Sequence, residues 1–91
     1  MNNNQVINGV GMKVRIFDLD KGLTEYEHIK VIRIVSKDYN LLIMEDYLSI
    51  IGEIEGSIDI KSEDIDISFS KIKAFYMNSG NVFNLMIKEV E

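Results

Sequence analysis

Apolar and polar residues alternate with a period of two along much of this chain, and this pattern constrains its fold more than any other feature. Residues 57–61 run Ser-Ile-Asp-Ile-Lys, residues 65–70 alternate again, and Val14 and Ile16 alternate with two basic residues. Successive side chains of an extended strand point to opposite faces, so a period of two predicts strands with one buried face.

The composition favours the same conclusion. Fifteen isoleucines and seven valines stand against one alanine, Ala74. Side chains branched at Cβ suit a pleated sheet better than a helix. Turn-forming segments separate the alternating runs at residues 20–22, 37–40, 62–64 and 78–81. We therefore predict an all-β domain over residues 12–91, a small antiparallel sandwich or barrel of seven to eight short strands, with residues 1–11 as a flexible polar tail.

Several details of this sheet can be predicted. We expect residues 23–36 to form an extended stretch that bends or splits near His28. Residues 41–44 are apolar at every position, which predicts a central strand. The apolar phase shifts near Lys71, which indicates a bulge or a new strand there. The last strand, residues 82–90, is long and lacks proline, so it could be an exposed edge that pairs with a second copy.

The composition also excludes several classes of protein. Without cysteine the chain has no disulfides and no thiolate metal site, so we expect a cytoplasmic protein. The longest apolar runs, such as residues 41–44, are far shorter than the roughly 20 residues that cross a bilayer. The N-terminus lacks the pattern of a signal peptide. A single histidine, His28, excludes a histidine-rich metal site, and we expect no cofactor.

The net charge of −5 is unevenly distributed. Residues 45–66 contain eight acidic residues and one basic residue, a charge of −7, and leave +2 for the remainder. This field repels phosphate backbones and can steer a basic protein partner. We therefore predict a non-enzymatic protein-interaction module, an adaptor or a small assembly subunit, that binds no nucleic acid. The predicted partner-binding residues are Glu45, Asp46, Tyr47, Glu53 and Glu55.

A second set of residues suits either an interface or a core. It consists of Tyr39, Tyr47, Phe75, Tyr76 and Met77. Aromatic residues and methionine are enriched at the centres of interfaces. In a domain this small, however, we expect most of them to fill the core.

Residues 14–24 resemble the first motif of haloacid dehalogenase-type phosphatases, in which one aspartate is the nucleophile and a second is the acid–base. Asp18 and Asp20 would take these roles, with magnesium as cofactor. In that family the second aspartate is followed by glycine and threonine, whereas here Lys21 intervenes. The family also needs an α/β domain, for which the chain offers no helices. We expect a strand that ends in an aspartate-rich hairpin turn, and no enzyme.

The order of predicted elements resembles the N-terminal β-sandwich of the ATP synthase epsilon subunit over residues 12–91. A first strand, Gly22, a strand bearing Glu25, residues 29–35, the turn at 38–40, residues 41–44 and residues 57–61 follow that order. Residues 45–49 depart from the proline-rich loop of the family, and its C-terminal helical hairpin is absent. The resemblance implies a sandwich that contacts the rotor, without nucleotide binding or regulation.

Overall fold

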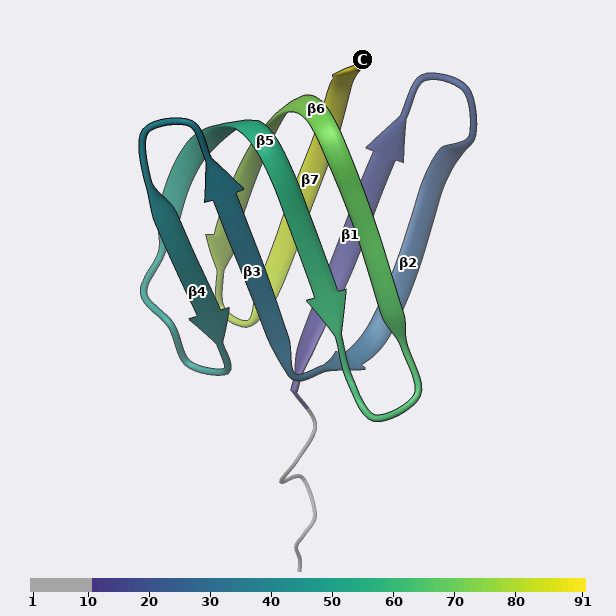
Figure 1. Cartoon of the computed structure of the whole chain (residues 1–91). Coiled ribbons are helices and arrows are strands. Elements are labelled where there is room, and N and C mark those ends of the chain that lie inside the picture. The colour runs from purple at the N-terminus through teal and green to yellow at the C-terminus, as the bar shows by residue number, and fades with distance from the viewer. Residues whose placement is uncertain (1–10) are drawn as a thin grey trace, which may run out of the picture.

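A computed structural model describes residues 11–91, and within this range the chain forms strands and no helix (Figure 1). No helix that could span a membrane occurs in these residues. The predicted tail lies outside the described residues except for Gly11, which is buried. The strands are β1 (Met12–Asp18), β2 (Gly22–Ile29), β3 (Val31–Ser36), β4 (Asn40–Met44), β5 (Ile50–Lys61), β6 (Asp66–Ser79) and β7 (Val82–Val90).

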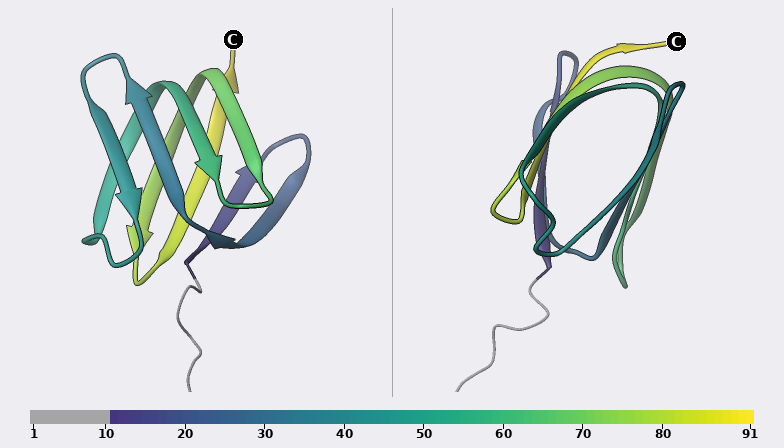
Figure 2. Two further views of the ribbon diagram at one scale, coloured as in Figure 1. Left: turned by 60° about the horizontal axis from the view of Figure 1, so that its bottom comes forward. Right: turned by 90° about the vertical axis from the view of Figure 1, so that its left-hand side faces the viewer.

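The seven strands form a single sheet in the order β2-β1-β7-β6-β5-β3-β4. Neighbouring strands run antiparallel except β1 and β7, which run parallel. The sheet folds over on itself to give a sandwich of two layers (Figure 2). The predicted all-β sandwich is therefore confirmed. Its two longest strands have 12 and 14 residues, however, so they are not short.

These two long strands, β5 and β6, carry the sheet from one layer to the other. Residues 50–56 of β5 pair with the end of β6 that borders β7, whereas residues 56–61 of β5 also pair with β3. The β5–β6 register shifts between Gly56 and Ile58, and Lys71 in β6 has a left-handed backbone with φ of 56°. A bulge increases local twist and bend. The predicted irregularity at Lys71 is thus confirmed.

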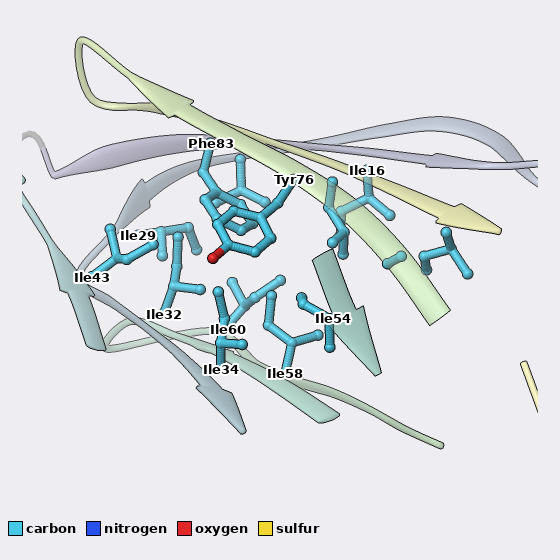
Figure 3. Close-up of a cluster of buried hydrophobic side chains, with 14 of the residues drawn as sticks. Ile16, Ile29, Ile32, Ile34, Ile43, Ile54, Ile58, Ile60, Tyr76 and Phe83 are labelled. Carbon is cyan, nitrogen blue, oxygen red and sulfur yellow. The ribbon is translucent and has the colours of Figure 1, made fainter. Parts of the chain in front are cut away.

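The core lies between the two layers and is built mainly from isoleucine (Figure 3). The rings of Tyr76 and Phe83 stack there, with their centroids 5.6 Å apart. Each strand contributes the apolar half of its alternating pattern, which is the reason the period of two predicted these residues as buried. The inward residues include Val14, Ile16, Ile32, Ile34, Ile43, Ile54, Ile58, Ile60, Ile72 and Leu85.

The predicted split near His28 is also confirmed. His28 has a φ of 61°, β2 ends at Ile29, and β3 begins at Val31. The two strands then lie near opposite ends of the sheet. The backbone N–H of Lys30 donates a hydrogen bond to the carbonyl of Lys61 at 2.9 Å.

The prediction that residues 41–44 form a central strand is wrong. These residues belong to β4, which is the last strand of the sheet. Leu41 and Ile43 point toward the interior, whereas Leu42 and Met44 lie on the outer face and are exposed. A strand with apolar residues on both sides therefore need not be covered on both sides.

The prediction of an exposed edge at residues 82–90 is also wrong. These residues form β7, which lies between β1 and β6 and pairs with both. The parallel partner β1 comes from the other end of the chain, and local sequence patterns do not reveal such a pairing. The edges of the sheet are β2 and β4 instead.

Candidate protein-interaction surface

A row of exposed or half-buried apolar side chains crosses four adjacent strands on the outer face of one layer. Phe17 on β1 pairs with Leu23 on β2 and with Met86 on β7, and Met86 pairs with Phe75 on β6. Paired residues on neighbouring strands point to the same side of a sheet, so these four side chains form one continuous row. Met86 is 53% exposed and Phe75 is 40% exposed.

Further apolar residues widen this row. Met77 on β6 pairs with Ile51 on β5, and both are exposed. Leu19, in the turn after β1, is 90% exposed. Soluble monomers seldom expose apolar patches larger than a few hundred Å², and larger ones mark interaction sites. We call this surface the outer apolar patch, and it consists of Phe17, Leu19, Leu23, Ile51, Phe75, Met77 and Met86.

The patch is hollowed by two shallow grooves. The first has a volume of about 370 Å³, almost entirely apolar walls, and a lining that includes Ile51, Phe75 and Met86. The second, about 260 Å³, runs past Leu19 and Leu23. Phe17 and Met86 line both grooves. The two grooves are therefore adjacent, with Phe17 and Met86 common to both, and we call them together the furrow.

A charged rim borders the patch on the side of β1 and β2. Arg15 Nε lies 2.9 Å from Glu25 Oε2, and its guanidinium lies 5.4 Å from the centre of the Phe17 ring. Lys13 Nζ lies 3.7 Å from Glu25 and 3.9 Å from Glu27. Because positive and negative groups are paired here, the rim adds little net charge to the surface.

The opposite rim comes from β5, β6 and β7. Lys88 Nζ lies 4.4 Å from the centre of the Phe75 ring, and Lys73 Nζ lies 3.9 Å from Glu89 Oε1. Glu53 on β5 pairs with Phe75 in the sheet and so borders the patch. An apolar centre with a polar rim is the usual anatomy of a protein–protein interface.

Three of the predicted partner-binding residues lie in or beside the turn after β4. Glu45 is exposed, whereas Tyr47 is half-buried and packs against the core. The Asp46 backbone N–H donates to Asn81 Oδ1 at 2.6 Å, and Asn81 Nδ2 donates to Asp46 Oδ1 at 3.1 Å. Asp46 and Tyr47 therefore have structural contacts within the domain.

The other two predicted residues, Glu53 and Glu55, lie within β5, away from this turn. Glu55 Oε1 lies 3.1 Å from Lys37 Nζ, and the hydrogen bond and charge of Glu55 raise the pKa of Lys37. The structure does not bring the five residues together, although Glu53 borders the outer apolar patch. Their role in binding a partner stays a prediction.

The acidic segment as a whole is divided between the two outer faces of the sandwich. Glu53 and Glu55 pair with Phe75 and Lys73 in one layer. Asp59 pairs with Arg33 in the other layer and accepts a hydrogen bond from Ser68 Oγ at 2.6 Å. The change of layer within β5 separates charges that are close in sequence.

The predicted aromatic set is divided in a similar way. Tyr76 is buried, as expected, but Phe75 and Met77 are exposed in the patch. A signal for the patch was present in the sequence, because Phe17, Phe75 and Met86 stand at positions that should be polar in strands with one buried face. Alternation alone does not reveal that such residues align across strands.

Asp18 and Asp20 have the geometry of a hairpin turn. Asp18 ends β1, and its Oδ1 accepts a hydrogen bond from the backbone N–H of Asp20 at 2.8 Å. This contact between an aspartate side chain and the backbone two residues later is typical of turns. The predicted aspartate-rich turn is confirmed.

The fold has a counterpart among solved structures. A chain in the central stalk and c-ring of the Tetrahymena thermophila mitochondrial ATP synthase matches with a TM-score of 0.69 and 13% sequence identity. The match covers 86% of this protein and 63% of that chain, so this protein spans less than two thirds of its counterpart. No protein-family model matches the sequence. No curated protein matches it.

This match confirms, at the level of the fold, the resemblance to an ATP synthase subunit that the order of strands suggested. Sequence identity of 13% shows a common fold and nothing about shared activity. The neighbour is part of a multi-subunit complex, the central stalk and c-ring of an ATP synthase.

Proposed function

We propose that this protein is an interaction module, a small subunit of a larger assembly, that binds another protein through the outer apolar patch. The observation that carries the proposal is the continuous outer row from exposed Leu23 through half-buried Phe17 to exposed Met86 and Phe75. Leaving this surface in water is unfavourable, and covering it contributes roughly 25 cal/mol for each Å² of apolar area.

The character of the surface defines the partner. Methionine and phenylalanine line the furrow, and the rim charges Lys13, Arg15, Lys73, Glu25, Glu27 and Glu89 form ion pairs within the domain. A partner with a ridge of aliphatic or aromatic side chains complements it best. Because few unbalanced charges take part, this binding should depend weakly on salt, in contrast to recognition by acidic residues.

The proposal can be tested by site-specific photo-crosslinking in cells that express the protein naturally. A photoreactive residue at Met86 should crosslink to one discrete protein, whereas the same residue at exposed Leu48, in the loop after β4, should not. The substitution Phe75→Gln should suppress the crosslink from position 86, because Phe75 is its neighbour in the row. Equal labelling from positions 86 and 48 would contradict the proposal.

A second, more specific candidate is a stalk subunit that contacts the rotor of an ATP synthase. The supporting observation is the TM-score of 0.69 with a chain of such a stalk. In that case the tagged protein should co-purify with the ATP synthase of its own cells, and Met86→Lys should abolish this while Leu48→Lys should not. An assembly that excludes the tagged protein would rule out this candidate.

We infer that the module works without catalysis. The support is that Asp18 uses a carboxylate oxygen to order its turn. The purified protein should not hydrolyse p-nitrophenyl phosphate with Mg²⁺ above the rate of its Asp18→Asn variant. Hydrolysis that is lost in Asp18→Asn would overturn this inference.

A further inference from the structure

The two edges of the sheet differ in how they are protected from pairing with another strand. β2 carries Glu25 and Glu27, and charged side chains discourage edge-to-edge association. β4 reads Asn-Leu-Leu-Ile-Met, with neither a charge nor a proline, and the outward residues Leu42 and Met44 are 44% and 52% exposed. The edge without charged side chains is therefore β4.

The hairpin between β3 and β4 shows which backbone groups of β4 point away from the sheet. Ser36 and Tyr39 exchange backbone hydrogen bonds of 2.8 and 3.4 Å, so they form a hydrogen-bonded pair. Such pairs alternate along an antiparallel ladder. Leu41 and Ile43 consequently direct their N–H and C=O groups to β3, and the groups that face outward belong to Asn40, Leu42 and Met44.

These outward groups are arranged symmetrically about Leu42. An antiparallel copy of β4 centred there places Leu42 opposite its own counterpart and Asn40 opposite Met44. Every outward N–H then meets an outward C=O. The Met44 carbonyl already accepts the N–H of Tyr47 at 3.1 Å, but a carbonyl has a second lone pair. If the register between the two β4 strands shifts by two residues, some of the outward N–H and C=O groups have no partner.

We propose that β4 pairs with β4 of a second copy of this chain about a two-fold axis through Leu42. The pairing joins two sandwiches through a continuous sheet. It covers exposed Leu42 and Met44 on the outer face and half-buried Leu41 on the inner face. A self-complementary edge fits a two-fold dimer, because each copy supplies the same surface. This proposal is independent of the proposed function, which uses the opposite part of the sheet.

The absence of cysteine from the sequence allows a test of both the dimer and its register. In a hydrogen-bonded antiparallel pair the two Cα atoms lie about 5.5 Å apart, within the range of a disulfide. Leu42→Cys should therefore form a covalent dimer under mild oxidation. Asn40→Cys should not, because the two copies of residue 40 are offset by about 13 Å along the strands. A mixture of Asn40→Cys and Met44→Cys should crosslink.

Sedimentation of the cysteine-free protein completes the test. The wild type should form a dimer, Leu42→Lys should be a monomer, and Met86→Lys in the outer apolar patch should remain a dimer. A wild type that stays monomeric at millimolar concentration overturns the proposal. In that case β4 would pair with a peptide of another protein instead of a second copy. Equal disulfide yields from Leu42→Cys and Asn40→Cys also overturn it, as does a dimer that only Met86→Lys dissociates.

Discussion

The hydroxyl groups of Tyr39 and Tyr76 lie 3.0 Å apart and connect the hairpin between β3 and β4 to the core. The Tyr39 hydroxyl also contacts the carbonyl of Glu53, to which it donates. A phenol has one hydrogen, so Tyr76 donates to Tyr39, and Tyr39 donates to Glu53. The two hydrogen bonds therefore have a defined direction, from Tyr76 to Tyr39 and from Tyr39 to the carbonyl of Glu53. Tyr76 is 3% exposed, and this donation satisfies its hydroxyl.

The Tyr76 hydroxyl should make the free energy of unfolding depend on pH in the alkaline range. Burial, followed by the hydrogen bond to Tyr39, raises the pKa of Tyr76 above its ordinary value of about 10. The folded state therefore holds this proton at pH values where the unfolded state loses it. The contribution is fully present below about pH 10 and is lost as the pH rises from there toward the folded-state pKa.

We expect Tyr76→Phe to lower the free energy of unfolding by about 1 kcal/mol at pH 7. The difference from the wild type should narrow above about pH 10. Urea unfolding between pH 7 and 11 measures both quantities. A difference that stays constant to pH 11 would show that the Tyr76 hydroxyl titrates alike in the folded and unfolded states.

Gly52 on β5 should tolerate no larger residue, because Tyr76 occupies the space of a side chain. A Cβ on Gly52 would overlap the Tyr76 hydroxyl and lie 2.6 and 2.8 Å from its Cζ and Cε1 atoms. We expect Gly52→Ala to lower the free energy of unfolding by about 1–3 kcal/mol, the usual cost of overpacking. In a Tyr76→Phe background the cost should be smaller, since one of the overlapping atoms is gone. Equal costs in the two backgrounds would contradict this steric explanation.

Asn81 should matter both for its side chain and for its backbone conformation. It has a φ of 64° and exchanges two hydrogen bonds with Asp46. Asn81→Gly and Asn81→Ala both lose these hydrogen bonds, about 1 kcal/mol each, but glycine also removes the Cβ, which costs about 1–2 kcal/mol in the left-handed region, whereas alanine keeps it. Thermal unfolding should therefore show that Asn81→Gly is more stable than Asn81→Ala. The opposite order of the two variants would show that this turn relaxes to another conformation.

The sequence was sufficient to predict where strands occur along the chain, but not their order in the sheet. Alternation located inward residues such as Ile58 and Ile60, because burial of one face imposes a period of two on each strand separately. The position of β4 at an edge and of β7 in the middle depends on pairings between distant segments. Leu42 shows the difficulty, since an exposed leucine and a buried one are identical in a local pattern.

The candidate surface was anticipated only in part. Phe75 and Met77 were recognised as possible contact residues, but Met86 and Leu23 were not. Their significance arises from the register, which aligns residues from four strands into one row. For the acidic residues the error was the opposite one, because the prediction grouped side chains that the fold separates. Glu53 and Asp59 are close in sequence but face different sides of the sandwich, because β5 passes from one layer to the other.

Leu85 and Met86, neighbours on β7, should respond to truncation in opposite ways. Leu85 is fully buried in the core, and Met86 is 53% exposed on the outer face. Leu85→Ala removes packed methyl groups and leaves a cavity, so it should lower the free energy of unfolding by about 2–5 kcal/mol. Met86→Ala should change it by less than about 0.5 kcal/mol, as is usual for surface positions. A partner crosslink from a photoreactive residue at Leu23, in the same row, should respond in the reverse order, lost in Met86→Ala and retained in any Leu85→Ala protein that is still folded. A Met86→Ala variant as unstable as Leu85→Ala would mean that Met86 stabilises the isolated domain, and the patch would lose its main argument for a partner.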